Sequence, residues 1–118
     1  MLFRSRGESY APRVIIYENA NYKGDELTLY PGEEVDDLSQ LRFRNGARVN
    51  DAISSVRVIG AVELMAFEHH RFEGQVIRVT EDVRNFADRR MHDSAQSWND
   101  RISSLVVRWN REIGRAHV

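Results

Sequence analysis

A six-residue phrase occurs twice in this chain: residues 50–55 read NDAISS, and residues 99–104 read NDRISS. We call the two copies phrase 1 and phrase 2. In each, an Asn-Asp pair precedes and a Ser-Ser pair follows a single isoleucine, which is Ile53 in phrase 1 and Ile102 in phrase 2. Chance repetition at five of six positions is improbable in a chain of 118 residues. The repetition therefore indicates a duplicated unit, a site rich in oxygen atoms, or both.

The sequence that precedes each phrase is repeated as well. The segment VIIYENANYKGDELTLY at 14–30 aligns with LMAFEHHRFEGQVIRVT at 64–80, so that aromatic, acidic and glycine positions coincide. The matched pairs are Tyr17 with Phe67, Glu18 with Glu68, Tyr22 with Phe72, and Gly24 with Gly74. Because the register drifts by only one or two residues over the whole span, the chain consists of two tandem units.

The repeat predicts the domain organisation of the chain. We expect one domain at 13–109, divided into unit 1 at 13–59 and unit 2 at 61–109, with short tails at 1–12 and 110–118. Its apolar fraction of 42% and charged fraction of 30% are ordinary for a globular protein that buries a core.

Charge and composition make several function classes improbable. The chain has 17 basic and 18 acidic residues, so no overall field attracts nucleic acid or an acidic membrane surface. No apolar run is long enough to span a bilayer, and the first residues, MLFRSRGESYAP, lack the apolar stretch of a signal peptide. Cysteine is absent, which excludes disulfides, thiolate metal sites and a cysteine nucleophile.

Apolar residues recur at the period of β-strands in both units. DELTLY and QVIRVT alternate apolar with polar residues, and Leu105, Val107 and Trp109 alternate after phrase 2. Each phrase isoleucine stands three residues before such an alternation, so the phrase should enter its strand through a bend. Only 84–96 could hold a short helical turn. Short strands separated by turn signals predict an all-β sandwich of two Greek-key motifs.

An aromatic-x4-aromatic-x-Gly spacing opens both units, as YENANYKG and FEHHRFEG. We expect the first strand to fold over into a hairpin that the two aromatic rings cover. Gly24 and Gly74 should then adopt the positive φ that glycine tolerates. Together with the later phrase N-D-x-I-S-S, this spacing resembles the βγ-crystallin domain, particularly its calcium-binding microbial members. The resemblance covers 13–109 and implies two four-stranded Greek keys that pair into a wedge-shaped sandwich.

The resemblance also implies two calcium sites, because N/D-N/D-x-x-S/T-S is the calcium signature of that family and its sites are shared between units. Site 1 would take the Ala52 carbonyl, the Ser54 hydroxyl, the Glu18 carbonyl and the Asp100 carboxylate. Site 2 would take the Arg101 carbonyl, the Ser103 hydroxyl, the Glu68 carbonyl and the Asp51 carboxylate. The remaining polar residues of the phrases would hold the loops by hydrogen bonds; these are Asn50, Asn99, Ser55 and Ser104.

Calcium chemistry agrees with these residue types, since calcium takes six to eight oxygen ligands at flexible angles. The alternative is that the Asx and Ser side chains only form hydrogen bonds with backbone groups at the bend of each phrase. Arg101 stands where phrase 1 has Ala52. Its guanidinium would weaken site 2 if it leaned toward the ion. The two sites are therefore expected to differ.

Other functions remain as alternatives on the same fold. A structural protein without calcium would keep the hairpins but lose Asp or Ser from the phrases. A carbohydrate-binding module would need an exposed aromatic platform; Trp98 is a candidate, although its place before phrase 2 favours the core. An inhibitor-like, protein-binding role would require a protruding loop, for which 84–98 is the candidate. We expect no enzyme, no nucleic-acid or membrane partner, and a monomer. The compartment stays open, with calcium availability favouring the extracellular or periplasmic side.

Four further patterns are weaker indications of function. His69-His70 and His92 could suggest zinc, but adjacent histidines rarely converge on one ion. His92-Asp93-Ser94 contains the letters of a catalytic triad without its geometry. The acidic pairs at 33–34 and 36–37 are more typical of a solvated turn than of a glycosidase. Arg42, Arg44 and Arg48 form a basic cluster near Asn45-Gly46 with no accompanying nucleic-acid-binding signature.

Overall fold

The structure is a computed structural model that describes residues 11–43, 45–49, 53–89, 91 and 97–111. Seven strands and four 3-10 turns make up its regular elements. The strands are β1 (Arg13–Asn19), β2 (Lys23–Leu29), β3 (Glu34–Val35), β4 (Ser55–Ile59), β5 (Val62–His69), β6 (Glu73–Val79) and β7 (Ser104–Trp109). The turns are η1 (Ala20–Tyr22), η2 (Leu38–Gln40), η3 (His70–Phe72) and η4 (Phe86–Asp88).

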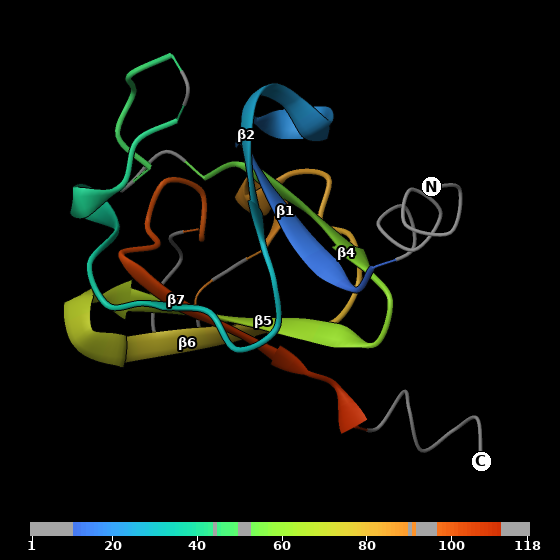
Figure 1. The fold of residues 1–118 in the computed structure, drawn as a ribbon. Coiled ribbons are helices and arrows are strands. Elements are labelled where there is room, and N and C mark those ends of the chain that lie inside the picture. The colour runs from blue at the N-terminus through green and yellow to red at the C-terminus, as the bar shows by residue number, and fades with distance from the viewer. Residues whose placement is uncertain (1–10, 44, 50–52, 90, 92–96, 112–118) are drawn as a thin grey trace.

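The strands form two antiparallel sheets that pack face to face, as Figure 1 shows. The orders are β2-β1-β4 in one sheet and β3-β7-β5-β6 in the other. The predicted all-β sandwich is confirmed, and the short helical turn expected within 84–96 is η4. The described residues contain no helix of the length and apolarity that crossing a membrane requires.

The two units exchange their third strands. β3 of unit 1 pairs with β7 of unit 2, where Glu34 lies opposite Val106. In return, Val83 of unit 2 forms an isolated bridge with Val56 of unit 1, closed by backbone hydrogen bonds of 2.9 and 3.0 Å. Each sheet therefore contains backbone from both units, so the units fold as one body. Of the acidic pair at 33–34, Glu34 lies in this strand and Glu33 follows the turn before it, and both are exposed as predicted.

The folded hairpins have the predicted form in both units. The rings of Tyr17 and Tyr22 meet edge to face with centroids 5.7 Å apart, and those of Phe67 and Phe72 do the same at 5.7 Å. The glycines that follow have positive φ, +80° at Gly24 and +82° at Gly74. A Cβ atom on either would lie 2.5 Å from the side chain of Asn19 or His69, so both conformation and space require glycine.

The core lies between the sheets and is closed by large side chains from the connecting segments. Trp98, Phe86 and Leu38 are at most 1% exposed, and both phrase isoleucines are 1% exposed. Trp98 therefore belongs to the core, and the carbohydrate platform considered for it is wrong. The alternation of Leu105, Val107 and Trp109 predicted that all three side chains would face the core. Trp109 is 58% exposed instead, because β7 ends at this residue, beyond the covered part of the sheet.

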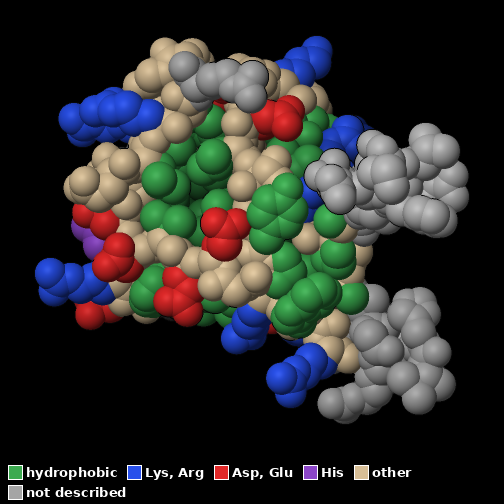
Figure 2. All heavy atoms as spheres, in the orientation of Figure 1, with side chains coloured by type: hydrophobic (Ala, Val, Ile, Leu, Met, Phe, Trp, Pro, Cys, Tyr) green, Lys and Arg blue, Asp and Glu red, His purple; other side chains and the backbone are tan. Residues whose placement is uncertain are grey.

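Figure 2 shows how side chains are distributed over one face of the molecule. Hydrophobic side chains gather in the middle of this face, and lysine and arginine side chains stand mainly at its periphery. The segment 41–49 extends from the sheets as an irregular hairpin, closed by the bridge between Arg42 and Arg48 (Figure 1). Its predicted turn at Asn45-Gly46 is present, and Gly46 has a φ of +91°.

Glu63 is a nearly buried carboxylate on the outer face of β5. Its strand neighbours Val62 and Leu64 point into the core, yet Glu63 is itself only 3% exposed. Arg78 donates from Nε and Nη2 to Glu63 Oε1 at 2.9 and 2.8 Å, and Arg108 Nε donates to Oε2. Burial raises the pKa of Glu63, but the hydrogen bonds and charges of the two arginines outweigh it and hold that pKa below the usual value of a glutamate.

This pKa predicts how acid destabilises the domain through Glu63. Because the folded pKa lies below the unfolded one, the ion pairs contribute fully above about pH 4.5 and lose their contribution as the pH falls through the lowered folded value. The free energy of unfolding in urea should therefore fall more steeply in acid for wild type than for Glu63→Gln. Glu81→Gln, at an exposed glutamate, is the matched control and should follow wild type. If the free energies of unfolding of wild type and Glu63→Gln differed by the same amount at every pH, this account would be contradicted.

Candidate metal centre

Each phrase enters the last strand of its unit through the same backbone contact. The Ser54 N–H donates to the Tyr17 carbonyl at 3.0 Å, and the Ser103 N–H donates to the Phe67 carbonyl at 2.9 Å. These bonds place each phrase beside the end of the first strand of its own unit, where Glu18 or Glu68 follows. The sequence-predicted partners within each unit are therefore neighbours in the structure.

The second serine of each phrase ties the folded hairpin to the last strand. Ser55 Oγ donates to the Asn19 carbonyl at 2.5 Å and accepts from the Tyr22 N–H at 3.0 Å. Ser104 Oγ repeats this arrangement, with 2.6 Å to the His69 carbonyl and 3.0 Å from the Phe72 N–H. Both serines are fully buried, and their predicted role in holding the loops is confirmed.

Glu18 and Glu68 lie at matching irregularities of their strands. The register between β1 and β2 shifts between Tyr17 and Asn19, and that between β5 and β6 shifts between Phe67 and His69. The glutamate in the middle of each shift has no opposite residue in the described ladder. Such a bulge releases the backbone from regular pairing, and so makes a carbonyl oxygen available to another partner.

Asp100 of phrase 2 meets Ser54 of phrase 1 across the boundary between the units. The Ser54 hydroxyl donates to Asp100 Oδ1 at 3.4 Å, and the Asp100 N–H lies 3.4 Å from the Ile53 carbonyl. Asp100 has a φ of +58°, a left-handed conformation that Asp and Asn adopt more readily than most residues. The structure therefore brings Ser54 and Asp100 of site 1 together, and Glu18 follows Tyr17, whose carbonyl accepts from Ser54; the fourth member, Ala52, is outside the described residues.

Two of the residues predicted for site 2, Glu68 and Arg101, border a neighbouring hollow. Glu68, His69, Asp100 and Arg101 line a depression of about 350 Å³. Asp100 consequently borders both predicted sites, and the exposed Arg101 side chain shares the hollow with two acidic residues. Asp51, the fourth member of site 2, is outside the described residues, as is Asn50. Asn99 holds phrase 2 as predicted, since its Nδ2 donates to Asp100 Oδ2 at 3.1 Å.

The 3-10 turns η2 and η4 connect each phrase to the other unit. The Leu38 N–H donates to the Ser103 carbonyl at 2.9 Å, and the Phe86 N–H donates to the Ser54 carbonyl at 2.8 Å. Each turn begins with a side-chain cap, from Asp37 in η2 and from Asn85 in η4. Hydrogen bonds from Ser39 lower the pKa of Asp37, which keeps this cap ionised. Each phrase is therefore held in place by both units.

Asn45 takes a role beside site 1 that sequence reasoning did not assign. Its Nδ2 donates to Glu18 Oε1 at 3.0 Å, and its backbone N–H donates to Asp25 Oδ2 at 2.6 Å. The Asn45-Gly46 turn was recognisable in the sequence, but its partner 27 residues away was not. The Glu18 side chain thus anchors the hairpin through Asn45, whereas the predicted role of Glu18 in site 1 uses its backbone carbonyl.

The described histidines and acidic pairs do not gather into a metal site. Within the described ranges, no group of three or more His, Asp or Glu side chains is arranged to hold an ion. His70 Nδ1 instead lies 3.2 Å from Asp37 Oδ1, joining the hairpin of unit 2 to unit 1. His92-Asp93-Ser94 and Arg44 lie outside the described residues.

Comparison with known proteins assigns the chain to a family, although no family model matches it. Spherulin-3A of Physarum polycephalum is 31% identical over 96 residues, which cover 80% of this chain and 80% of that protein. Gamma-crystallin D of Bos taurus is also 31% identical over 96 residues, covering 79% of this chain and 52% of that protein. The chain spans about half the length of the gamma-crystallins that it matches.

A solved structure gives the same result for the fold. A βγ-crystallin domain from Flavobacterium johnsoniae matches with a TM-score of 0.63 and 25% identity, over 82% of this chain and 94% of that chain. The chain belongs to the βγ-crystallin family. The strand exchange and paired hairpins described above are thus features of a βγ-crystallin domain.

The donor atoms around the phrases of this βγ-crystallin domain suit one class of metal ion. The Ser54 hydroxyl, the Asp100 carboxylate and the backbone at Glu18 all offer oxygen, which calcium prefers. Zinc in proteins usually takes several nitrogen or sulfur ligands, and the hollow beside this bend has a single imidazole among its lining residues, that of His69. The residues present therefore fit calcium and fit zinc poorly.

Proposed function

We propose that this βγ-crystallin domain binds two calcium ions, one at each phrase, and that the ions stabilise its fold. The observation that carries the proposal is the 3.4 Å approach of Ser54 Oγ to Asp100 Oδ1 across the two units. An ion held by hydroxyl, carboxylate and carbonyl oxygens at this bend would depend on residues from both units. Since those residues meet only after folding, the ion would bind the folded form alone.

The affinity should be modest and should differ between the two sites. Each predicted set contains one full carboxylate, which corresponds to affinities of roughly micromolar to millimolar among calcium sites. Arg101 shares its hollow with Glu68 and Asp100, so its positive charge opposes a cation there. Phrase 1 has alanine at the equivalent position, Ala52, and carries no such charge. Site 1 is therefore proposed as the tighter of the two.

Calorimetric titration of calcium into metal-free protein tests the proposal directly. We expect two ions per chain with unequal affinities. Asp100→Ala should remove the carboxylate of site 1 and reduce the stoichiometry toward one, while Asp88→Ala should leave both sites. Asp88 is a suitable control because it is exposed, equally acidic and absent from both predicted ligand sets.

The same variant tests the crossing of ligands between units. The amide signals of Ser54 and Ser103 are matched reporters, since each donates to its first strand in the same way. In Asp100→Ala, added calcium should still shift the Ser103 amide but no longer the Ser54 amide. Loss of the response at Ser103 with retention at Ser54 would show that the assignment of carboxylates is reversed. No heat and no shift in wild type would refute calcium binding altogether.

A further inference from the structure

Two arginines lie directly opposite each other on the hairpin 41–49, which extends from the sheets (Figure 1). The isolated antiparallel bridge of this hairpin pairs Arg42 with Arg48. One backbone hydrogen bond closes the bridge on each side of the pair, from Phe43 to Ala47 at 2.8 Å and from Val49 to Leu41 at 3.1 Å. At such a position of an antiparallel pair the Cα atoms are about 4.5 Å apart, and the side chains are closer than at the alternate positions.

Both arginine side chains occupy the solvent face of the hairpin. Residues opposite each other in an antiparallel pair project to the same side, and their neighbours along each strand project to the other side. The neighbours Phe43 and Val49 are buried, at 3% and 0% exposure, so their face packs on the core. Arg42 and Arg48 are exposed on the opposite face. The hairpin therefore presents two arginine side chains together to solvent.

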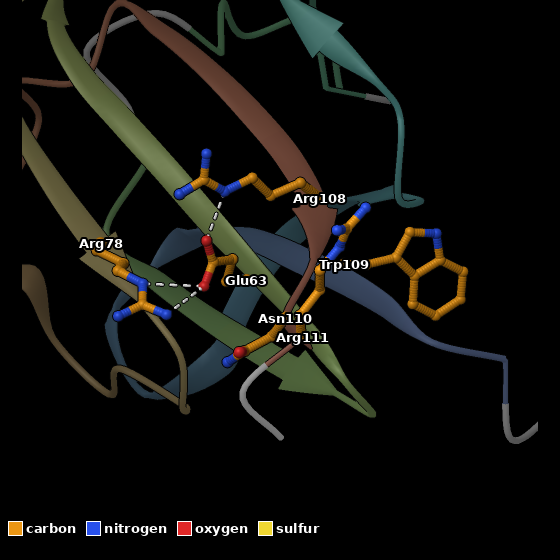
Figure 3. A pocket seen from close by; sticks show the side chains of 6 residues that line it. All are labelled: Glu63, Arg78, Arg108, Trp109, Asn110 and Arg111. Atoms are coloured by element: carbon orange, nitrogen blue, oxygen red, sulfur yellow. Dashed lines mark hydrogen bonds and ion pairs between the residues drawn. The ribbon is translucent and has the colours of Figure 1, made fainter. Parts of the chain in front are cut away.

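A carboxylate neutralises the arginines that strand pairing brings together elsewhere in the molecule. Arg78 of β6 and Arg108 of β7 lie on either side of β5, and Figure 3 shows both directed at Glu63 of that strand. The negative charge between them offsets their mutual repulsion. Without such a charge, like charges on paired strands are destabilising.

The arginines of the hairpin have no carboxylate between them among the described residues. The carboxylates of Asp25 and Glu18 contact this hairpin at its tip, where both accept hydrogen bonds from Asn45. No ion pair joins a described acidic residue to Arg42 or Arg48. The bonds at the tip tie the hairpin to β1 and β2, so the two cations are presented by an anchored segment.

The guanidinium groups retain donors for a ligand. Nη1 of Arg42 donates to the Gly46 carbonyl at 3.1 Å, and this neutral acceptor leaves the positive charge of Arg42 in place. A guanidinium has five N–H donors in one plane, which match the oxygens of phosphate or sulfate. An oxyanion between the two arginines would supply the negative charge that Glu63 supplies to the other pair.

We propose that Arg42 and Arg48 form an oxyanion site, which binds a phosphate or sulfate group between their side chains. The bound group accepts hydrogen bonds from both arginines and replaces their repulsion with two attractions. Neither arginine belongs to the predicted calcium sites, so this binding does not require calcium. A chain of linked phosphates should bind more tightly than a single ion, because a second group is already close when the first dissociates.

Titration of inorganic phosphate, sulfate and tripolyphosphate into the intact chain tests the proposal. Calcium-free buffer of low ionic strength avoids calcium phosphate and limits screening of exposed charges. Nitrogen-proton spectra follow the arginine Nε–H signals. We expect saturable shifts at Arg42 and Arg48, and none at Arg57, whose guanidinium stacks on the Tyr22 ring. Tighter binding of tripolyphosphate than of phosphate would assign the site to linked oxyanions, and equal binding to a single ion. Absence of saturable shifts with all three probes would overturn the proposal.

A charge variant separates the paired arginines from general attraction of anions to the surface. Arg48→Gln should weaken binding about threefold or more, the scale of an exposed charge pair. Arg84→Gln is the matched control, because it removes the same charge from an exposed arginine outside the hairpin. It should change binding little. Equal weakening by the two variants would mean that the anion responds to net charge alone, and the site would be rejected.

Reversal of one charge tests the repulsion on which the site depends. Arg48→Glu places opposite charges across the bridge, so the urea midpoint in phosphate-free buffer should rise while binding of phosphate is lost. A variant that merely damaged the hairpin would lose binding and stability together. A lower midpoint in Arg48→Glu would therefore show that the two arginines do not repel each other in the free protein, and would remove the basis of the proposal.

Discussion

Saturating calcium should raise the melting temperature of this domain by about ten degrees or more above that of chelator-treated protein. An ion that binds only the folded form stabilises it by RT ln(1 + [L]/Kd), which is about 2.7 kcal/mol at a hundredfold excess over Kd. Each kcal/mol raises the midpoint of a domain of this size by roughly 4 to 8 °C. Two sites would approach twice the single-site effect, and unequal sites would give less. Circular dichroism during heating measures the difference.

Two controls connect this shift to the phrases. Ser54→Arg together with Ser103→Arg should abolish the calcium effect, because a cation then replaces a predicted ligand at each site. Magnesium should have little effect on wild type, since it requires tighter octahedral geometry and loses its water reluctantly. Identical melting of wild type in calcium and in chelator would mean that the phrases are only structural bends.

Replacement of the buried tryptophan should produce the other large effect. Trp98→Ala is expected to lower the free energy of unfolding by about 3 to 5 kcal/mol, because it leaves a cavity in a core that cannot collapse around it. Trp98 is 1% exposed, and its backbone N–H donates to the Arg89 carbonyl at 2.8 Å. Since domains are stable by only about 5 to 15 kcal/mol, this is a large share of the total. Urea unfolding in saturating calcium measures it.

Trp109→Ala is the matched control, because it removes the same side chain from a position that is 58% exposed. Surface substitutions usually change stability by less than about 0.5 kcal/mol. The two tryptophan variants should therefore differ several-fold in their effect on the urea midpoint. Similar losses for both would show that the cavity argument fails and that Trp109 is covered in solution.

Local features of the fold could be predicted from the spacing of residues alone. The strand alternation, the aromatic pairs over the hairpins and the positive φ of Gly24 and Gly74 all follow from contacts between residues close in sequence. Such interactions depend on a few neighbouring dihedral angles, which short sequence patterns constrain. The loop-holding role of Ser55 and Ser104 was implied by the family resemblance instead, because their partners Asn19 and His69 are 36 and 35 residues away in sequence.

The spacing of residues within each unit did not specify the contacts between the units. Pairing of β3 with β7 and of Val83 with Val56 depends on how the two sheets dock, which no spacing within one unit specifies. Ser54 and Asp100, 46 residues apart, also meet through this docking, and their proximity was implied by the family resemblance rather than by spacing. The strand alternation also placed Trp109 in the core, whereas the end of the covering sheet leaves it exposed. Tertiary packing decides these features because burial and long-range contacts depend on what the rest of the chain covers.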